Sequence, residues 1–129
     1  MRRRQGASAV EFALGASVLL VLGAGITEWG WAMRCQTAVI SAAREGARTG
    51  AGTLQDDDPI ASAEVRAAAA LDDAGLDSDT ATVTATIDGA DPDASISVSV
   101  DLPHPALVPL VPTLGTLSST ATMRLQDQP

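Results

Sequence analysis

The side chains that most often carry out chemistry in proteins are scarce in this sequence. His104 is the only histidine and Cys35 the only cysteine. A structural zinc site needs further ligands of these types, and an intramolecular disulfide needs a second cysteine. The sequence also contains no glycine-rich phosphate loop and no nucleophile elbow. We therefore expect no catalytic, cofactor-binding or metal-binding residues and no enzymatic activity.

Two weaker chemical alternatives stay open. Cys35 could be a reactive thiol or form an intermolecular bridge, but a small apolar side chain on a helix is the interpretation we favour. Asp88, Asp91 and Asp93 cluster in a short acidic stretch. Because this stretch lacks a full ligand loop and a closing bidentate glutamate, we expect an ordinary turn rather than a calcium site.

Charged and aromatic residues are distributed unevenly along the chain. The formal charge is −8, yet Arg2, Arg3 and Arg4 precede an apolar run and most acidic residues lie beyond Asp56. All of the aromatic residues lie in the first quarter of the chain. An acidic part without aromatic residues lacks the basic patch and the stacking surface that bind nucleic acid. We therefore exclude a nucleic-acid partner and expect a thin, aliphatic core.

The apolar run predicts a helix that spans a membrane. No charge interrupts residues 12–27, and residues 12–33 rise about 33 Å as a helix, which is enough to cross a hydrocarbon core of about 30 Å. Trp29 and Trp31 fit an aromatic belt at the membrane interface, with Glu28 near the outer edge of the span. The positive-inside rule places the leading arginines in the cytoplasm and the C-terminal part outside it.

Two other interpretations of the same run stay open. A soluble protein could bury this helix, although three leading arginines fit a topology signal better. A cleaved secretory signal could end near Gly25 and leave a mature N-terminus near Ile26. Glu11 and the continuation of the helical pattern through residues 38–50 count against that cleavage.

The spacing of Gly6 and Glu11 resembles the processing signal of type IV pilins, in which a short basic leader ends in glycine and is followed by four residues, a glutamate and an aromatic residue. The resemblance implies that a prepilin-type peptidase cuts between Gly6 and Ala7. It also implies that Glu11, followed by Phe12, pairs during assembly with the new N-terminal amine of a neighbouring subunit. A carboxylate among packed apolar helices needs such a cationic partner. The alternative is that Glu11 extends to the lipid headgroups.

A second resemblance covers residues 6–51. Glu11-Phe12, Glu28-Trp29 and the element "AAREGAR" at residues 42–48 occur in the order and approximate spacing found in the TadE/TadG family of pseudopilins. Trp29 stands where that family usually has phenylalanine or tyrosine, and the large insertions of some TadG proteins are absent, so a short TadE-like protein is the closer match. The resemblance implies a minor pseudopilin of a tight-adherence (Flp-type) pilus or secretion system. Its implied partners are other pseudopilins, pilus-assembly proteins, the prepilin-type peptidase and membrane lipid.

The "AAREGAR" element also carries charges that need partners. On a helix Arg44 and Arg48 share one face, where like charges one turn apart repel mildly, while Glu45 points about 100° away. We expect an acidic partner for this face, which could be an aspartate of the C-terminal half, a lipid phosphate or a neighbouring subunit. The alternative is a solvated helix end stopped by Gly50 and Gly52.

A second helix is predicted from about Pro59 to Ala74, with Asp58 as its N-cap and Gly75 closing it. Its apolar positions form a narrow, alanine-rich stripe suited to close packing. The residues assigned to this stripe are Ile60, Val65, Ala68, Ala69 and Leu71.

The pattern then changes to a period of two, which predicts three half-buried strands in residues 80–87, 95–102 and 116–125, the first two joined as a hairpin. A proline-punctuated loop between the second and third strands carries an apolar stretch, Leu107 to Val111. Proline excludes it from a central strand, and it is too apolar for a solvated loop. We expect it to cover the sheet edge, to rest on the first helix, or to touch the membrane or a partner.

The expected fold is α+β and pilin-like: a long N-terminal transmembrane helix, then a second helix packed on a small three-stranded antiparallel sheet. Residues 1–6 form a cytoplasmic leader, residues 7–51 the transmembrane helix with its extension outside the cytoplasm, and residues 52–129 a small extracytoplasmic domain. We expect a single-pass protein of the cytoplasmic (inner) membrane that acts by helix packing. The resemblance to TadE-like pseudopilins implies roles in secretion or cell adhesion. The alternative function is a tethered or secreted binding module that uses the apolar loop as its ligand surface.

Overall fold

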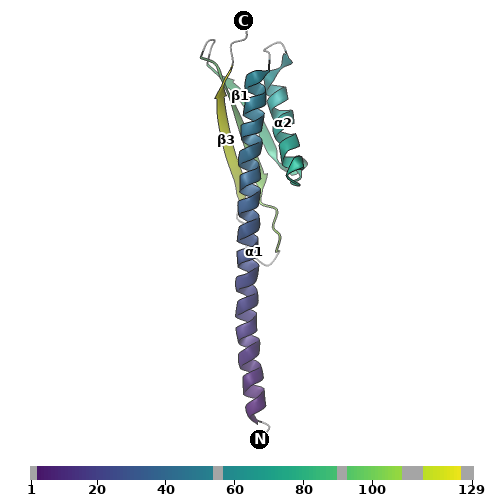
Figure 1. Ribbon diagram of the computed structural model, residues 1–129, viewed down its shortest axis with the longest axis vertical. Coiled ribbons are helices and arrows are strands. Elements are labelled where there is room, and N and C mark those ends of the chain that lie inside the picture. Colours follow the sequence, from purple (N-terminus) through teal and green to yellow (C-terminus); the bar gives the residue numbers. More distant parts are fainter. Residues whose placement is uncertain (1–2, 54–56, 90–92, 109–114, 126–129) are drawn as a thin grey trace.

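The computed structural model describes residues 3–53, 57–89, 93–108 and 115–125, with side chains from residue 8 onward. The expected α+β fold is confirmed (Figure 1). In chain order the elements are helix α1 (Arg3–Gly52), helix α2 (Pro59–Asp73), the short 3-10 helix η2 (Ser78–Thr80) and strands β1 (Thr82–Asp88), β2 (Ser95–Pro103) and β3 (Thr116–Arg124).

The three strands form an antiparallel sheet in the order β1-β2-β3. Ala85 of β1 and Ala121 of β3 both pair with Val98 in the middle of β2. The alternating residues of β1 and β3 are less buried than those of β2, because these two strands form the edges of the sheet. The central strand buries every second side chain, as the twofold pattern predicts: Ile96, Val98, Val100 and Leu102.

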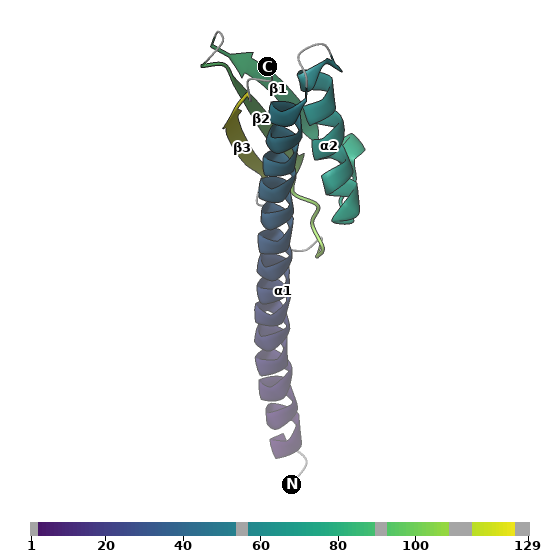
Figure 2. The same ribbon diagram turned by 45° about the horizontal axis from the view of Figure 1, so that its top comes forward.

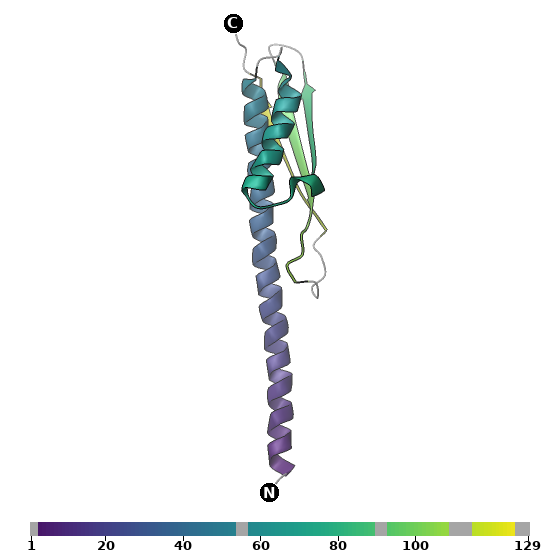
Figure 3. The same cartoon turned by 90° about the vertical axis from the view of Figure 1, so that its right-hand side faces the viewer.

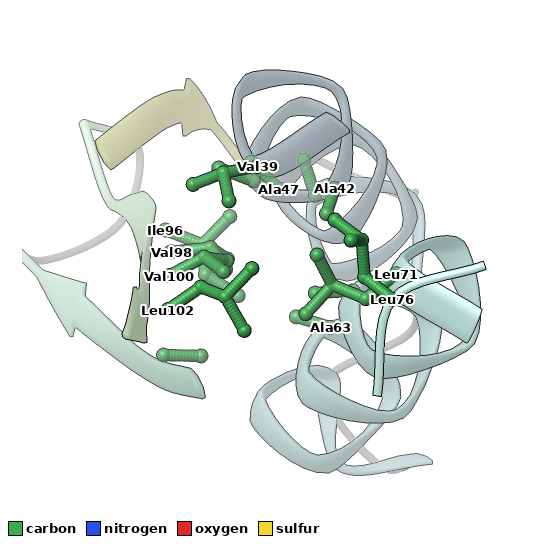
Figure 4. Close-up of a cluster of buried hydrophobic side chains, with 14 of the residues drawn as sticks. Val39, Ala42, Ala47, Ala63, Leu71, Leu76, Ile96, Val98, Val100 and Leu102 are labelled. Atoms are coloured by element: carbon green, nitrogen blue, oxygen red, sulfur yellow. The ribbon is translucent and has the colours of Figure 1, made fainter. Parts of the chain in front are cut away.

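Both helices cover the same face of this sheet (Figure 2). Helix α1 contacts β2 and β3, while α2 packs beside it and contacts β1. The side chains of the helices and the sheet meet in one layer between them (Figure 4). The largest fully buried side chains are those of Leu71, Ile96 and Leu102. Within the described residues the buried cluster contains no aromatic side chain, so the core is aliphatic, as the sequence predicts.

The two halves of α1 have different surroundings. The upper half, from about residue 28 to residue 51, packs against α2, the sheet and the segment that follows β2, while the lower half projects beyond the folded part (Figure 3). The projecting half exposes large apolar side chains such as Phe12, 77% exposed, and Ile26, 74% exposed. Within the described residues, α1 from Ser8 to Gly52 is long and apolar enough to cross a membrane, and its most apolar window is unburied. The chain therefore presents an apolar helix that its own fold does not cover.

Helix α2 begins and ends where the sequence predicts. Asp58 is the N-cap and accepts a hydrogen bond from the amide of Ala61 at 3.1 Å, and Gly75, with φ 75°, follows the helix. The predicted buried stripe is only partly right, because Val65 is 70% exposed. The face that packs inward has a spacing of four residues and consists of Pro59, Ala63, Ala67 and Leu71. Val65 lies two residues from Ala63 and Ala67, about 200° around the helix, so a face centred on these alanines turns it outward.

Candidate functional site

Helices α1 and α2 are in close contact at Gly46 of the "AAREGAR" element and at Gly50, two residues beyond that element. A Cβ atom added at Gly46 would lie 2.8 Å from the carbonyl oxygen of Ala63 and 2.9 Å from the Cβ of Ala67. One added at Gly50 would lie 2.8 Å from the Cβ of Ala63 and 2.9 Å from the carbonyl oxygen of Pro59. Only glycine allows the helices to approach this closely. Gly50 is therefore a packing residue inside α1, and of the two glycines considered as the stop of this helix, Gly52 is the one at which α1 ends.

The charged residues of this element point away from that contact. Glu45 forms an ion pair with Arg66 of α2, which also lies 3.6 Å from the carboxylate of Asp73. Arg44 and Arg48 are exposed, and neither forms an ion pair within the part of the chain that the structure describes. The fold thus provides a partner for Glu45 from within the chain and leaves both arginines on the outer surface of α1.

Cys35 is a packing residue of the upper half of α1. Its side chain is fully buried and belongs to the core cluster, which confirms the interpretation as a small apolar residue. Burial raises the pKa of the Cys35 thiol. The raised pKa disfavours the reactive thiolate form of Cys35, and the full burial of the side chain keeps reagents away from it. A pocket of about 500 Å³ lies between α1 and the end of α2, with Arg34, Cys35 and Asp73 among its lining residues.

Glu28 forms a buried polar contact with the segment that follows β2. Although it lies on the helix that the sequence assigns to the membrane, its side chain is only 2% exposed. Its Oε1 accepts a hydrogen bond from Nε2 of His104 at 2.8 Å. Its Oε2 accepts from the backbone amides of Leu107 at 3.1 Å and Val108 at 2.7 Å. Three donors from one loop therefore converge on a single buried carboxylate.

His104 and Trp31 complete this contact. Because an ionised carboxylate only accepts hydrogen bonds, Nε2 of His104 carries the proton. The other ring nitrogen, Nδ1, is buried without a partner among the described residues. Trp31 donates its indole N–H to the carbonyl oxygen of Pro105 at 2.7 Å, and the guanidinium of Arg34 lies 5.0 Å from the centre of the Trp31 ring. We refer to residues 104–108 as the docked loop.

The structure separates residues that the sequence grouped at the membrane interface. Glu28 points inward under the docked loop, Trp31 is half-buried against it, and Trp29 is exposed. Of the three placements considered for the apolar loop, its described part rests on α1. Leu110 and Val111 lie outside the described residues. Sequence reasoning missed the pairing of Glu28 with His104, although a histidine held between two prolines was the available signal.

The residues of the predicted processing and assembly motif lie far from this contact, on the projecting half of α1. Gly6 and Ala7 are helical, and the side chains of Glu11 and Phe12 are exposed. Within the described residues the fold brings no other element against Glu11 or Phe12. No group of three or more histidine, cysteine, aspartate or glutamate side chains suited to a metal gathers in the described ranges.

Comparison with known proteins gives one match. Residues 6–48 match the family model described as TadE-like protein. No curated protein matches the chain, and no solved structure matches it either. The matched stretch includes Glu11, Glu28 and Gly46, so it contains the projecting helix, the carboxylate under the docked loop and one glycine of the helix contact. Over residues 6–48 the chain is therefore similar to TadE-like proteins, as the motifs of this stretch predict.

Proposed function

We propose that this protein is a membrane-anchored minor pseudopilin of a tight-adherence (Flp-type) pilus or secretion system and that it acts by helix packing rather than by catalysis. The observation that carries the proposal is the shape of α1. One uninterrupted helix is fixed at its upper end in a folded core and exposes an apolar surface along its lower end. Such a surface calls for an apolar environment, which a bilayer or neighbouring helices provide.

The TadE-like match supports the same conclusion, because it covers the projecting helix and continues into the packed part. In the proposed topology the arginines before residue 5 stay in the cytoplasm. The lower half of α1 spans the inner membrane, and the sheet with α2 lies outside the cytoplasm. A prepilin-type peptidase cuts after Gly6, and the new amine of Ala7 then becomes available to Glu11 of a neighbouring subunit.

The outer surface of α1 offers a further contact for assembly. Arg44 and Arg48 are exposed one turn apart, whereas the charges of Glu45 and Arg66 are satisfied between the two helices. An acidic surface on a neighbouring subunit, or lipid phosphates, would match the two arginines. In this proposal the partners are other proteins of the tight-adherence system, and the contribution to cell adhesion comes from assembly with them rather than from an enzymatic activity.

The experiment that tests the proposal is to measure the mass and the N-terminal sequence of the mature protein extracted from membranes. We expect wild-type protein to begin at Ala7 and the Gly6→Leu variant to keep its leader. Gly15→Leu is the matched control, because Gly15 lies on the same half of α1 with open space around it. A mature N-terminus near Ile26, or processing of Gly6→Leu that matches the wild type, would contradict the pseudopilin proposal.

A further inference from the structure

The docked loop lies below the sheet, beside the lower part of the folded region of α1 (Figure 3). It is fixed there by Glu28 and Trp31, which hold its amides and the carbonyl oxygen of Pro105. Glu28 precedes Met33, the outer end of the span proposed above, by five residues of helix. At 1.5 Å per residue, the loop is attached about 7 Å inside that end.

Most backbone amides of the docked loop already donate a hydrogen bond within the protein and do not need water as a partner. The amides of Leu107 and Val108 donate to Glu28, and the amide of His104 donates to the carbonyl oxygen of Gly115 at 2.9 Å. Pro105 has no amide hydrogen. Within the described residues this leaves Ala106 as the one amide of the loop without a hydrogen bond. In hydrocarbon, backbone N–H and C=O groups must both be satisfied within the protein. The N–H groups of this loop nearly meet that condition, and among its carbonyl oxygens that of Pro105 accepts a hydrogen bond from Trp31.

The outward surface of the loop is apolar. Pro105, Ala106 and Leu107 are exposed, and Leu107 is 52% exposed. The two ionisable groups at this level, Glu28 and His104, are buried against each other. An ionisable group at membrane depth is tolerated when it pairs with another such group or with backbone. Glu28 thus accepts hydrogen bonds from three donors of the loop, while the exposed atoms of the loop are largely apolar.

From these observations we propose that the tip of the docked loop, Pro105 to Val108, is a second, non-spanning membrane contact that Glu28 holds in the interfacial layer of the bilayer. The ligand is the lipid surface itself, at the boundary between headgroups and acyl chains. A depth of about 7 Å falls within the range of 5–10 Å known for interfacial segments. The inference rests on the proposed anchoring of α1, and the test therefore measures that anchoring separately.

The test places a nitroxide spin label at three exposed apolar positions of the full-length protein, with Cys35→Ala as the background. The variants are Leu107→Cys on the loop, Ile26→Cys on the projecting helix and Val65→Cys on α2, whose native side chains are 52%, 74% and 70% exposed. Each protein is reconstituted into phosphatidylethanolamine–phosphatidylglycerol vesicles. Collisions of the label are measured with oxygen, which concentrates in the bilayer, and with a water-soluble nickel chelate.

We expect the label at position 107 to behave like the label at position 26, with more oxygen collisions and a loss of nickel collisions relative to position 65. A label at position 107 that matches position 65, while position 26 is lipid-exposed, would overturn the loop contact and leave the anchor standing. A label at position 26 that collides freely with nickel would overturn the anchor itself. A label at position 107 that is immobilised and reached by neither reagent would overturn the lipid contact in favour of a protein contact.

The role of Glu28 is tested in the same background. Glu28→Gln keeps the size of the side chain but removes the charge and one acceptor position, so the loop amides lose part of their acceptor. We expect the label at position 107 to gain nickel collisions in this variant, while the label at position 65 stays unchanged as a control for folding. Unchanged collisions at position 107 would show that Glu28 does not hold the loop at this depth.

Discussion

Replacing Gly46 with alanine should loosen the contact between α1 and α2, although the same replacement strengthens most helices. In a helix interior alanine is favoured over glycine by about 1 kcal/mol. At this position, however, the added methyl group would lie 2.8 Å from the carbonyl oxygen of Ala63 and 2.9 Å from the Cβ of Ala67. Both atoms belong to α2 and neither moves by side-chain rotation, so the helices have to separate.

The expected size of the effect follows from these two opposing contributions. Overpacking a filled core costs about 1–3 kcal/mol. Because the closest atom at Gly46 is a backbone oxygen, we expect the upper part of that range. After subtraction of the gain in helix propensity, the net loss in free energy of unfolding is about 1–2 kcal/mol. This corresponds to a roughly 5- to 30-fold larger unfolded fraction.

Cys35 provides the assay, because it is fully buried in the core that α1, α2 and the sheet form. A pulse of thiol reagent along a denaturant series, with the full-length protein in detergent micelles, reports the fraction of molecules in which this core is open. Gly46→Ala should shift the labelling midpoint to lower denaturant. Gly30→Ala on the same helix, with no atom within 4 Å of its added Cβ, should not. A midpoint for Gly46→Ala at or above the wild-type value would refute the close-packing argument.

The other predictions concern the helix cap, the inward face of α2 and assembly. Asp58→Ala should lower the free energy of unfolding by about 0.5–2 kcal/mol in the same assay. Asp58→Gly should lower it by only a few tenths of a kcal/mol, because the residue has φ 52° and glycine adopts that conformation freely. Leu71→Ala should lower the free energy of unfolding by about 2–5 kcal/mol, and Val65→Ala by less than about 0.5 kcal/mol. Similar losses at both positions would contradict the inward face of α2 described above. Glu11→Ala and Glu11→Gln should leave membrane levels intact but reduce co-purification with other pilus components, since a stranded amine at Ala7 costs about 3–5 kcal/mol where the pair is buried. Equal recovery of wild type and both variants would exclude the pairing.

Much of the fold is predictable from local pattern. The alternation in residues 95–102 identifies the central strand because both of its neighbours come from the same chain and one face is buried. Asp58 and Pro59 identify the start of α2 because a cap is a local feature of the backbone. The inward face of α2 was mispredicted at Val65, since side-chain hydrophobicity alone does not show that the partner helix presents glycines and so selects alanines.

The contact between Glu28 and the docked loop was not predictable in the same way. Glu28 and His104 are separated by 76 positions in the chain. Their pairing depends on the length of β2 and on the path of the chain after Pro103, which no local periodicity encodes. The sequence predicts only that Glu28 lies near the outer edge of the span, at the membrane interface. It does not show that a histidine and two backbone amides of a distant loop bind this carboxylate.

The continuity of α1 has a mechanical consequence for how the folded part is presented. The helix has 50 residues and is therefore about 75 Å long, without an interruption between its projecting half and its packed half. Transmembrane helices tilt by about 20° on average, and a rigid helix of this length with that tilt carries its upper end sideways by about 25 Å. The docked loop lies on one side of α1 only. Tilting α1 toward the loop and tilting it away from the loop are therefore not equivalent. In the anchored arrangement proposed above, the position of Glu28 around the helix axis then sets the direction in which the sheet and α2 face along the membrane surface.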